Sequence, residues 1–191
     1  MSATGIIVCV KGISTQAKVI QKFQMRRDEV AGRWNHTGLI YQSPYDFYLF
    51  EQAPIKDRKL KANSNMTHLQ HYTGQVVDGL ELLYLIPAFE YNPYYMELLL
   101  VEYSGIPYDY TSLLKYQVVR TLFNLWTGRI GKNASKRMVC HEFVMFIWNE
   151  YTKRYLGFEI FPGWATGNVE LMFYSAYFMH EVTLPNPFLK P

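Results

Sequence analysis

The sequence has few cysteines and no long apolar run. Only two cysteines, Cys9 and Cys140, occur among its 191 residues, which is too few for a disulfide framework. No stretch approaches the roughly 18 apolar residues that a membrane-spanning helix needs, so we expect no stable membrane span. The opening residues, MSATGIIVCVKG, lack a basic region and a long apolar core, so we expect no signal peptide and a cytoplasmic protein.

A strong charge bias and internal repeats are also missing. The net charge of +3 does not favour a nucleic acid or an anionic membrane as partner. We find no low-complexity segment and no long linker. Since 49% of the residues are hydrophobic, the chain can bury a substantial core, and we expect residues 1–191 to form one domain.

Short apolar runs and turn residues predict a mixed fold. Strands are expected at 5–10, 33–42, 46–53 and 80–87, and helices at 14–25, 93–103, 111–126 and from Cys140 onward. Residues 168–178 fit a short helix or a strand. Ser14 is a plausible N-cap, and the turn sequence SPYD predicts a hairpin between the second and third strands. Strands early and helices late indicate an α+β fold.

Cys140 opens the apolar helix of the stretch KRMVCHEFVMFIWNEY. A cysteine on the apolar face of a helix is usually a core residue, which is the simplest interpretation. Three features favour a reactive thiol instead. The helix start stabilises a thiolate, Lys136 and Arg137 add positive charge, and a glycine-bearing polar loop precedes them. A nucleophilic cysteine additionally needs a base.

Four of the five histidines are poor candidates for that base. His141 is adjacent to Cys140 and should point about 100° away on a helix. His68 and His71 form an H-x-x-H pair without a third ligand, and we expect them in a loop. His180 has no clear partner. No metal site is therefore indicated.

His36 is the strongest candidate base. It lies in the predicted strand WNHTGLIYQ, where Gly38 allows close approach of another backbone or a substrate. Glu51 is a lone carboxylate in the apolar run FYLFEQA, where a charge is unfavourable unless it is paired. In a hairpin, Glu51 can lie beside His36 and fix its tautomer. The alternatives are a core histidine and a carboxylate facing water.

The order of these residues resembles the circularly permuted papain-like families of the NlpC/P60 superfamily. The chain is most similar to the YiiX/YebB-like group and more distantly similar to the lecithin–retinol acyltransferase relatives. The matching segments are TGIIVCVKGISTQAKVIQ, NHTGLIY, YLFEQAP, GIPYDY, MVCHEFVMFIW and GNVELMFYSAYF. The resemblance spans roughly residues 5–178, and it depends on the order and spacing of these segments together.

The resemblance implies Cys140 as nucleophile, His36 as general base and Glu51 as the residue that orients it. It also implies a small antiparallel sheet packed against the helix of Cys140, and no metal or organic cofactor. The chain departs from the family pattern at Gly5-Ile6-Ile7, where Gly-Asp-Ile/Val is usual, and at His141, where a serine is usual. His141 could shift the thiolate's pKa or the choice of substrate.

The sequence therefore predicts a cysteine-dependent hydrolase or acyltransferase acting on an amide or ester bond. Its substrate would be a peptide, a cell-wall fragment or a lipid. Two alternatives stay open at this point. One is a catalytically silent binding module that keeps the papain-like groove. The other is a structural or interaction protein in which Cys140 is a core residue.

Overall fold

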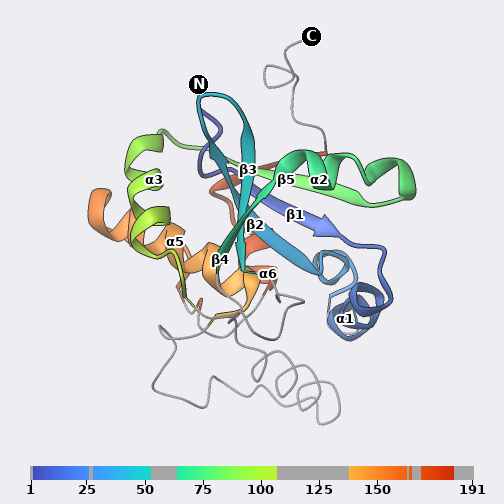
Figure 1. Cartoon of the computed structure of the whole chain (residues 1–191). Coiled ribbons are helices and arrows are strands. Elements are labelled where there is room, and N and C mark those ends of the chain that lie inside the picture. The colour runs from blue at the N-terminus through green and yellow to red at the C-terminus, as the bar shows by residue number, and fades with distance from the viewer. Residues whose placement is uncertain are drawn as a thin grey trace.

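A six-stranded antiparallel sheet forms the centre of the computed structural model, which describes residues 2–25, 28–52, 64–106, 138–162, 164 and 169–182 (Figure 1). The strand order is β4-β3-β2-β1-β5-β6. The strands are β1 (Ile7–Lys11), β2 (His36–Gln42), β3 (Phe47–Gln52), β4 (Ser64–His68), β5 (Glu81–Pro87) and β6 (Phe178–Glu181). Every neighbouring pair is antiparallel, and β2 and β3 form the predicted hairpin. The α+β prediction is confirmed.

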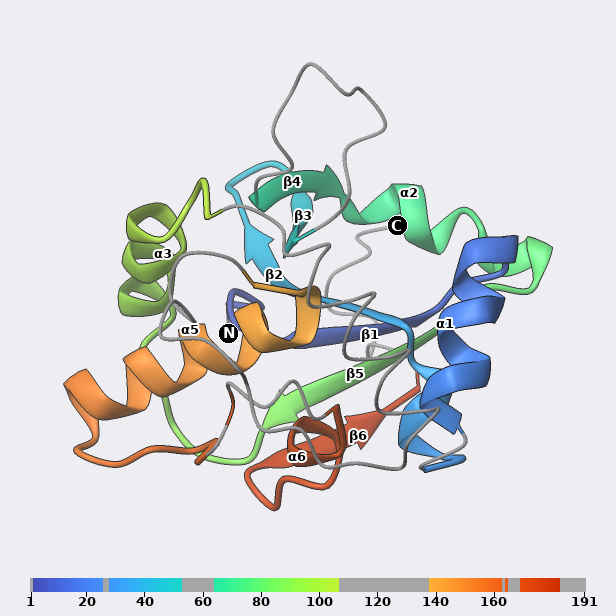
Figure 2. The same ribbon diagram turned by 90° about the horizontal axis from the view of Figure 1, so that it is seen from below.

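Helices lie at both ends of this sheet. They are α1 (Thr15–Met25), α2 (Leu69–Thr73), α3 (Pro93–Glu102), α5 (Cys140–Tyr155) and α6 (Val169–Phe173), with the 3-10 turns η1 (Ala31–Arg33) and η2 (Val76–Asp78). Figure 2 shows α3 and α5 at one end of the sheet and α1 at the other. Ser14 caps α1 as predicted, because its Oγ accepts a hydrogen bond from the Ala17 N–H at 3.1 Å.

The alternation of β1 divides the core into two clusters. Ile7 and Cys9 belong to the larger cluster, which contains the buried side chains of α5. Val8 and Val10 point to the opposite face and belong to a second cluster. Because both faces of β1 are covered, its sequence is apolar from Ile7 to Val10 and shows no alternation of polar residues there.

Helix α5 is the central helix of the larger cluster. Every residue from 140 to 149 is buried, and α5 contacts β2, β3 and α3. The Phe143 ring stacks on Phe50 of β3 with a centroid distance of 5.8 Å. Trp148 is fully buried, and its Nε1 donates a hydrogen bond to the Gly5 carbonyl at 3.1 Å. These contacts fix the direction in which the first turn of α5 points.

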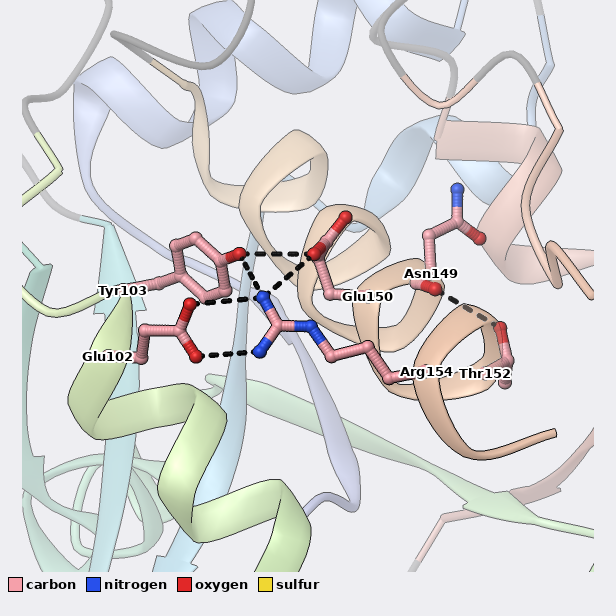
Figure 3. Close-up of polar contacts among 6 residues, drawn as sticks. All are labelled: Glu102, Tyr103, Asn149, Glu150, Thr152 and Arg154. Atoms are coloured by element: carbon pink, nitrogen blue, oxygen red, sulfur yellow. Dashed lines mark hydrogen bonds and ion pairs between the residues drawn. The ribbon is translucent and has the colours of Figure 1, made fainter. Parts of the chain in front are cut away.

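A surface cluster joins the far end of α5 to α3 (Figure 3). The Arg154 guanidinium donates to both carboxylate oxygens of Glu102, at 2.7 and 3.0 Å. It also donates to the Tyr103 hydroxyl at 2.6 Å and to Glu150 at 3.1 Å. We call Glu102, Tyr103, Glu150 and Arg154 the Arg154 cluster. A bidentate pair of this kind fixes the relative orientation of the two helices.

Three expectations differ from the observed fold. His68 and His71 do not lie in a loop, because His68 ends β4 and His71 lies in α2. Residues 168–178 provide both a helix, α6, and the start of a strand, β6. Gly38 does not leave open space, since an added Cβ would lie 2.7 Å from Leu49 Cγ. The Phe50 carbonyl oxygen lies 2.9 Å from the same position, so the close approach of another backbone is confirmed, and Leu49 occupies the space suggested for a substrate.

Several predicted segments lie outside the described residues. They are the helix at 111–126 and the polar loop with Lys136 and Arg137. Within the part of the chain that the structure describes, no helix has the length and apolar character needed to cross a membrane.

Candidate active site

His36 and Glu51 lie on neighbouring strands and point to the same face of the sheet. His36 is the first residue of β2 and is paired with Val10, whereas Glu51 of β3 is paired with Gly38. The two side chains are therefore diagonal neighbours, within reach of long side chains. His36 Nε2 forms a close ion pair with Glu51 Oε2. The Glu51 side chain is only 2% exposed, and that of His36 is 17% exposed.

Two further side chains hold the Glu51 carboxylate. Thr67 of β4 donates its hydroxyl to Oε1 at 2.6 Å, and Tyr72 of α2 donates to Oε2 at 2.6 Å. The Tyr72 ring also stacks near His36, with centroids 6.3 Å apart. Helix α2 supplies Tyr72 because it covers the face of the sheet that carries His36 and Glu51. A buried carboxylate with donors to both oxygens is satisfied as an anion.

Cys140 is the first residue of α5 and is 5% exposed. The preceding residue, Val139, has an extended backbone, and its N–H donates to Glu142 Oε2 at 3.2 Å. This bond is one half of a capping box and defines the helix start. The first turn of a helix has N–H groups without intrahelical acceptors and a partial positive charge. A thiolate at this position is stabilised by both.

The thiol and the imidazole shift each other's pKa. Burial alone would raise the pKa of Cys140, but hydrogen bonds with His141 and His36, together with their charges, hold it well below its ordinary value. Burial alone would likewise lower the pKa of His36. The charge of Glu51 and hydrogen bonds to Cys140 and Glu51 outweigh this effect and raise the pKa of His36 to about 10. The arrangement therefore favours a thiolate–imidazolium pair.

The carboxylate and its tyrosine partner shift in the directions this pair requires. Burial would raise the pKa of Glu51, but the charge of His36 and three hydrogen bonds hold it below its ordinary value. Burial and the charge of Glu51 raise the pKa of the Tyr72 hydroxyl. Tyr72 therefore keeps its proton and acts as a donor, while Glu51 stays ionised beside His36.

Cys9 has the opposite environment. It is fully buried within β1, and both cysteines are free thiols. Burial, and to a lesser extent the charge of Cys140, raise the pKa of the Cys9 thiol. A protonated, shielded thiol is a poor nucleophile, so only Cys140 combines the properties of a reactive cysteine.

His141 lies closer to the thiol than its position on a helix indicated. Its Nδ1 is 3.9 Å from Cys140 Sγ, although adjacent helical side chains point about 100° apart. The remaining histidines lie elsewhere. His68 Nδ1 contacts Asp46 at 2.8 Å, and His180 Nε2 donates to the Phe173 carbonyl at 2.7 Å.

The sequence did not indicate Thr67 and Tyr72. Both lie in a segment whose sequence is typical of a polar loop. Strand β4 is short, and its Met66 is 58% exposed. No alternating apolar pattern marks such a strand. Their role around Glu51 depends on the packing of β4 and α2 against β3.

An antiparallel sheet packed against a cysteine-bearing helix, with the histidine strand earlier in the chain, defines the permuted papain-like fold. The crystal structure of the metalloprotein YiiX from Escherichia coli O157:H7, DUF1105, is similar in fold to this chain. It matches with a TM-score of 0.58 over 95% of this chain and 97% of that chain, at 14% sequence identity. The expected YiiX-like fold is confirmed. No protein-family model and no curated protein matches the sequence.

The description of YiiX as a metalloprotein prompts a test of metal-binding groups in this chain. Among residues 2–25, 28–52, 64–106, 138–162, 164 and 169–182, no three His, Cys, Asp or Glu side chains are arranged to hold a metal ion. Cys140, His36 and Glu51 instead form a series in which each side chain interacts with the next. Such a series fits proton transfer better than metal ligation.

Proposed function

We propose that this protein is a cysteine-dependent hydrolase or acyltransferase acting on an amide or ester bond. Cys140 is the nucleophile, His36 the general base and Glu51 the residue that orients His36. One observation carries the proposal: the buried Glu51 carboxylate holds His36 in a close ion pair beside Cys140, the first residue of α5. The YiiX-like fold supports the proposal at the level of architecture.

The first step of the proposed reaction forms an acyl-enzyme. His36 uses Nε2 for Glu51, which leaves Nδ1 for the proton that Cys140 gives up. The Cys140 thiolate attacks the carbonyl carbon and forms a C–S bond, and the negative charge moves to the carbonyl oxygen. We assign the N–H groups of the first turn of α5 as the donors for this oxyanion. His36 then protonates the leaving amine or alcohol as its bond to carbon breaks.

The second step releases the acyl group. His36, now neutral, accepts a proton from water or from an acceptor hydroxyl or amine. That oxygen or nitrogen attacks the thioester carbonyl, the C–S bond breaks, and the thiolate–imidazolium pair is restored. Water gives hydrolysis and another acceptor gives acyl transfer. Glu51 stays ionised throughout and stabilises the imidazolium.

Three substrate classes fit this chemistry, namely a peptide, a cell-wall fragment and a lipid-linked acyl group. A panel of acyl-amide and ester reporters, peptidoglycan fragments and phospholipids would separate them. For each compound, intact-protein mass spectrometry would detect an acyl adduct, and peptide mapping would locate it. We expect a thioester on Cys140 that hydroxylamine removes. The matched control is Cys9→Ala, which should form the same adduct.

Two outcomes would contradict the proposal. Turnover that survives in Cys140→Ala would exclude Cys140 as nucleophile. A wild-type thiol that stays protonated and inert near neutral pH would favour the silent binding module, which needs the groove but no reactive cysteine.

A further inference from the structure

Cys140 has two histidines around its sulfur, although the proposed reaction uses only one. His36 approaches from β2, whereas His141 is the next residue of α5, with its Nδ1 3.9 Å from Sγ. This distance lies within hydrogen-bonding range for sulfur. His141 is 6% exposed, so its contact with the thiol is largely shielded from water. A shielded hydrogen bond to an anion is stronger than an exposed one.

The position of His141 also fits a donor that need not be charged. It is the second residue of α5, and an imidazolium there donates from Nδ1. A neutral imidazole with its proton on Nδ1 still donates a hydrogen bond to a thiolate. His36, in contrast, is held in the charged form by Glu51. The two histidines therefore act on the thiol from different elements, β2 and α5.

The other titratable groups that act on Cys140 cannot replace this donor. Cys9 of β1 is protonated and buried in the core, and the Tyr72 hydroxyl donates to Glu51. Neither provides a positive charge near the thiol. His36 and His141 are thus the two groups that lower the pKa of Cys140.

We propose that His141 is a positioning residue that donates a hydrogen bond from Nδ1 to the Cys140 thiolate, so that ionisation of the nucleophile does not depend on His36 alone. The inference rests on the proposed function, because it concerns the same nucleophile. It has a measurable consequence, since removal of either histidine should leave a partly activated thiol. Removal of both should return the thiol to its ordinary reactivity.

The test is the pH dependence of Cys140 alkylation by iodoacetamide in a Cys9→Ala background. It compares the parent protein with His36→Ala, with His141→Leu and with the double variant. At pH 6, we expect each single variant to react about tenfold more slowly, as for the loss of one hydrogen bond to a charged group. The double variant should titrate near the free cysteine value of about 8.5.

The pair His141→Asn and His141→Gln tests the atom involved. Asn places its amide near the position of Nδ1, whereas Gln places it near Nε2. Both remove the imidazole and are similar in polarity, so a general disturbance of α5 would affect both alike. We expect Asn to keep more of the low-pH reactivity than Gln. Circular dichroism and thermal unfolding of each variant would establish which ones are folded.

The outcomes separate this inference from the proposed function. If His36→Ala changes the profile and no folded His141 variant does, the inference is overturned while the proposed triad survives. If His141 variants change the profile and His36→Ala does not, the triad is overturned while the inference stands. An unchanged profile in both sets overturns both. Equal effects of Asn and Gln would exclude Nδ1 as the donor.

Discussion

An ion pair lies at each end of α5, and the two pairs differ in their exposure to water. At its start, the His36–Glu51 pair lies next to Cys140, and the Glu51 side chain is 2% exposed. At its end, Arg154 pairs with Glu102, whose side chain is 49% exposed. Each carboxylate accepts more than one hydrogen bond, and each has a depressed pKa. Both pairs join a cation to a carboxylate, but the Glu102 carboxylate is exposed to water and the Glu51 carboxylate is buried.

The difference shows what burial adds to an ion pair. Water screens the Arg154 cluster, so its interactions can orient helices but contribute little to stability. Around Glu51, burial works against the charge, and the pairing with His36 together with the donors Thr67 and Tyr72 offsets it. The buried pair can therefore influence the proton of Cys140, whereas the exposed pair has no thiol to act on. The predictions below test this contrast.

The largest effect is expected for Cys140→Ala, which removes the proposed nucleophile. Brief iodoacetamide treatment of the folded protein should label Cys140 and leave Cys9 unmodified, because their pKa values shift in opposite directions. Peptide mass mapping measures this directly. Cys140→Ala should lose all rapid labelling, whereas Cys9→Ala should keep it. Preferential labelling of Cys9 would refute the assignment.

His36→Ala should affect both the thiol and the fold. It removes the proton partner of Cys140, so the apparent pKa of the thiol should rise and alkylation near neutral pH should slow. It also leaves Glu51 buried without its positive partner. We expect the free energy of unfolding at pH 7 to fall by about 3 kcal/mol, near the lower end for a broken buried pair, because Thr67 and Tyr72 still bind the carboxylate. Urea unfolding measures this loss. No change in the alkylation profile would exclude His36 as the partner.

Glu51→Gln should impair turnover without removing the thiol. Gln fills the same space but cannot stabilise the imidazolium, so the fold and the Cys140 label should remain. The loss of turnover should be smaller than for Cys140→Ala, because an orienting carboxylate contributes less than the nucleophile. Kinetics on any substrate that Cys140→Ala fails to process would decide this. Wild-type turnover by Glu51→Gln would place the third residue elsewhere.

The pH dependence of stability should show the buried pair. His36 has a raised pKa, so its contribution is complete below about 6.5 and is lost as pH rises through about 10. Glu51 has a lowered pKa, so its contribution is present above its ordinary value and is lost as pH falls. Cys140 has a lowered pKa, so its thiolate adds stability as pH rises to the free cysteine value of about 8.5 and opposes the loss from His36. Wild type should therefore lose stability mainly between about pH 8.5 and 10. The double variant His36→Gln/Glu51→Gln should lose less, and equal slopes in urea unfolding would argue against the shift at His36.

Arg154→Ala should have the smallest effect, although it removes more hydrogen bonds than any substitution above. We expect the melting temperature to fall by less than about 3 °C, because the pair is exposed. Added salt should reduce the difference further. Arg154→Lys keeps the charge but not the bidentate geometry. Its melting temperature should lie between those of wild type and Arg154→Ala. A loss as large as that of His36→Ala would contradict the contrast between the two ends of α5.

Local patterns in the sequence determined much of the fold. Residues 46–53 and 33–42 have the composition of strands, and the SPYD turn requires them to pair. From that hairpin alone, Glu51 was expected beside His36, and the two side chains are in contact. The apolar run from Cys140 onward likewise predicted α5, since side chains on a helix repeat every three to four residues. Whether Cys140, His36 and Glu51 act in catalysis stays a prediction.

Tertiary structure alone decided which side chains complete the candidate site. Thr67 and Tyr72 reach Glu51 only because β4 adds to the edge of β3 and α2 folds over the same face. Their segment carries no pattern that distinguishes it from a loop. The contact of His141 with Cys140 is equally absent from the helical spacing. A sequence pattern specifies a local conformation, but the packing of distant elements determines which polar groups share a buried space. That shared burial sets the pKa values on which the proposed chemistry depends.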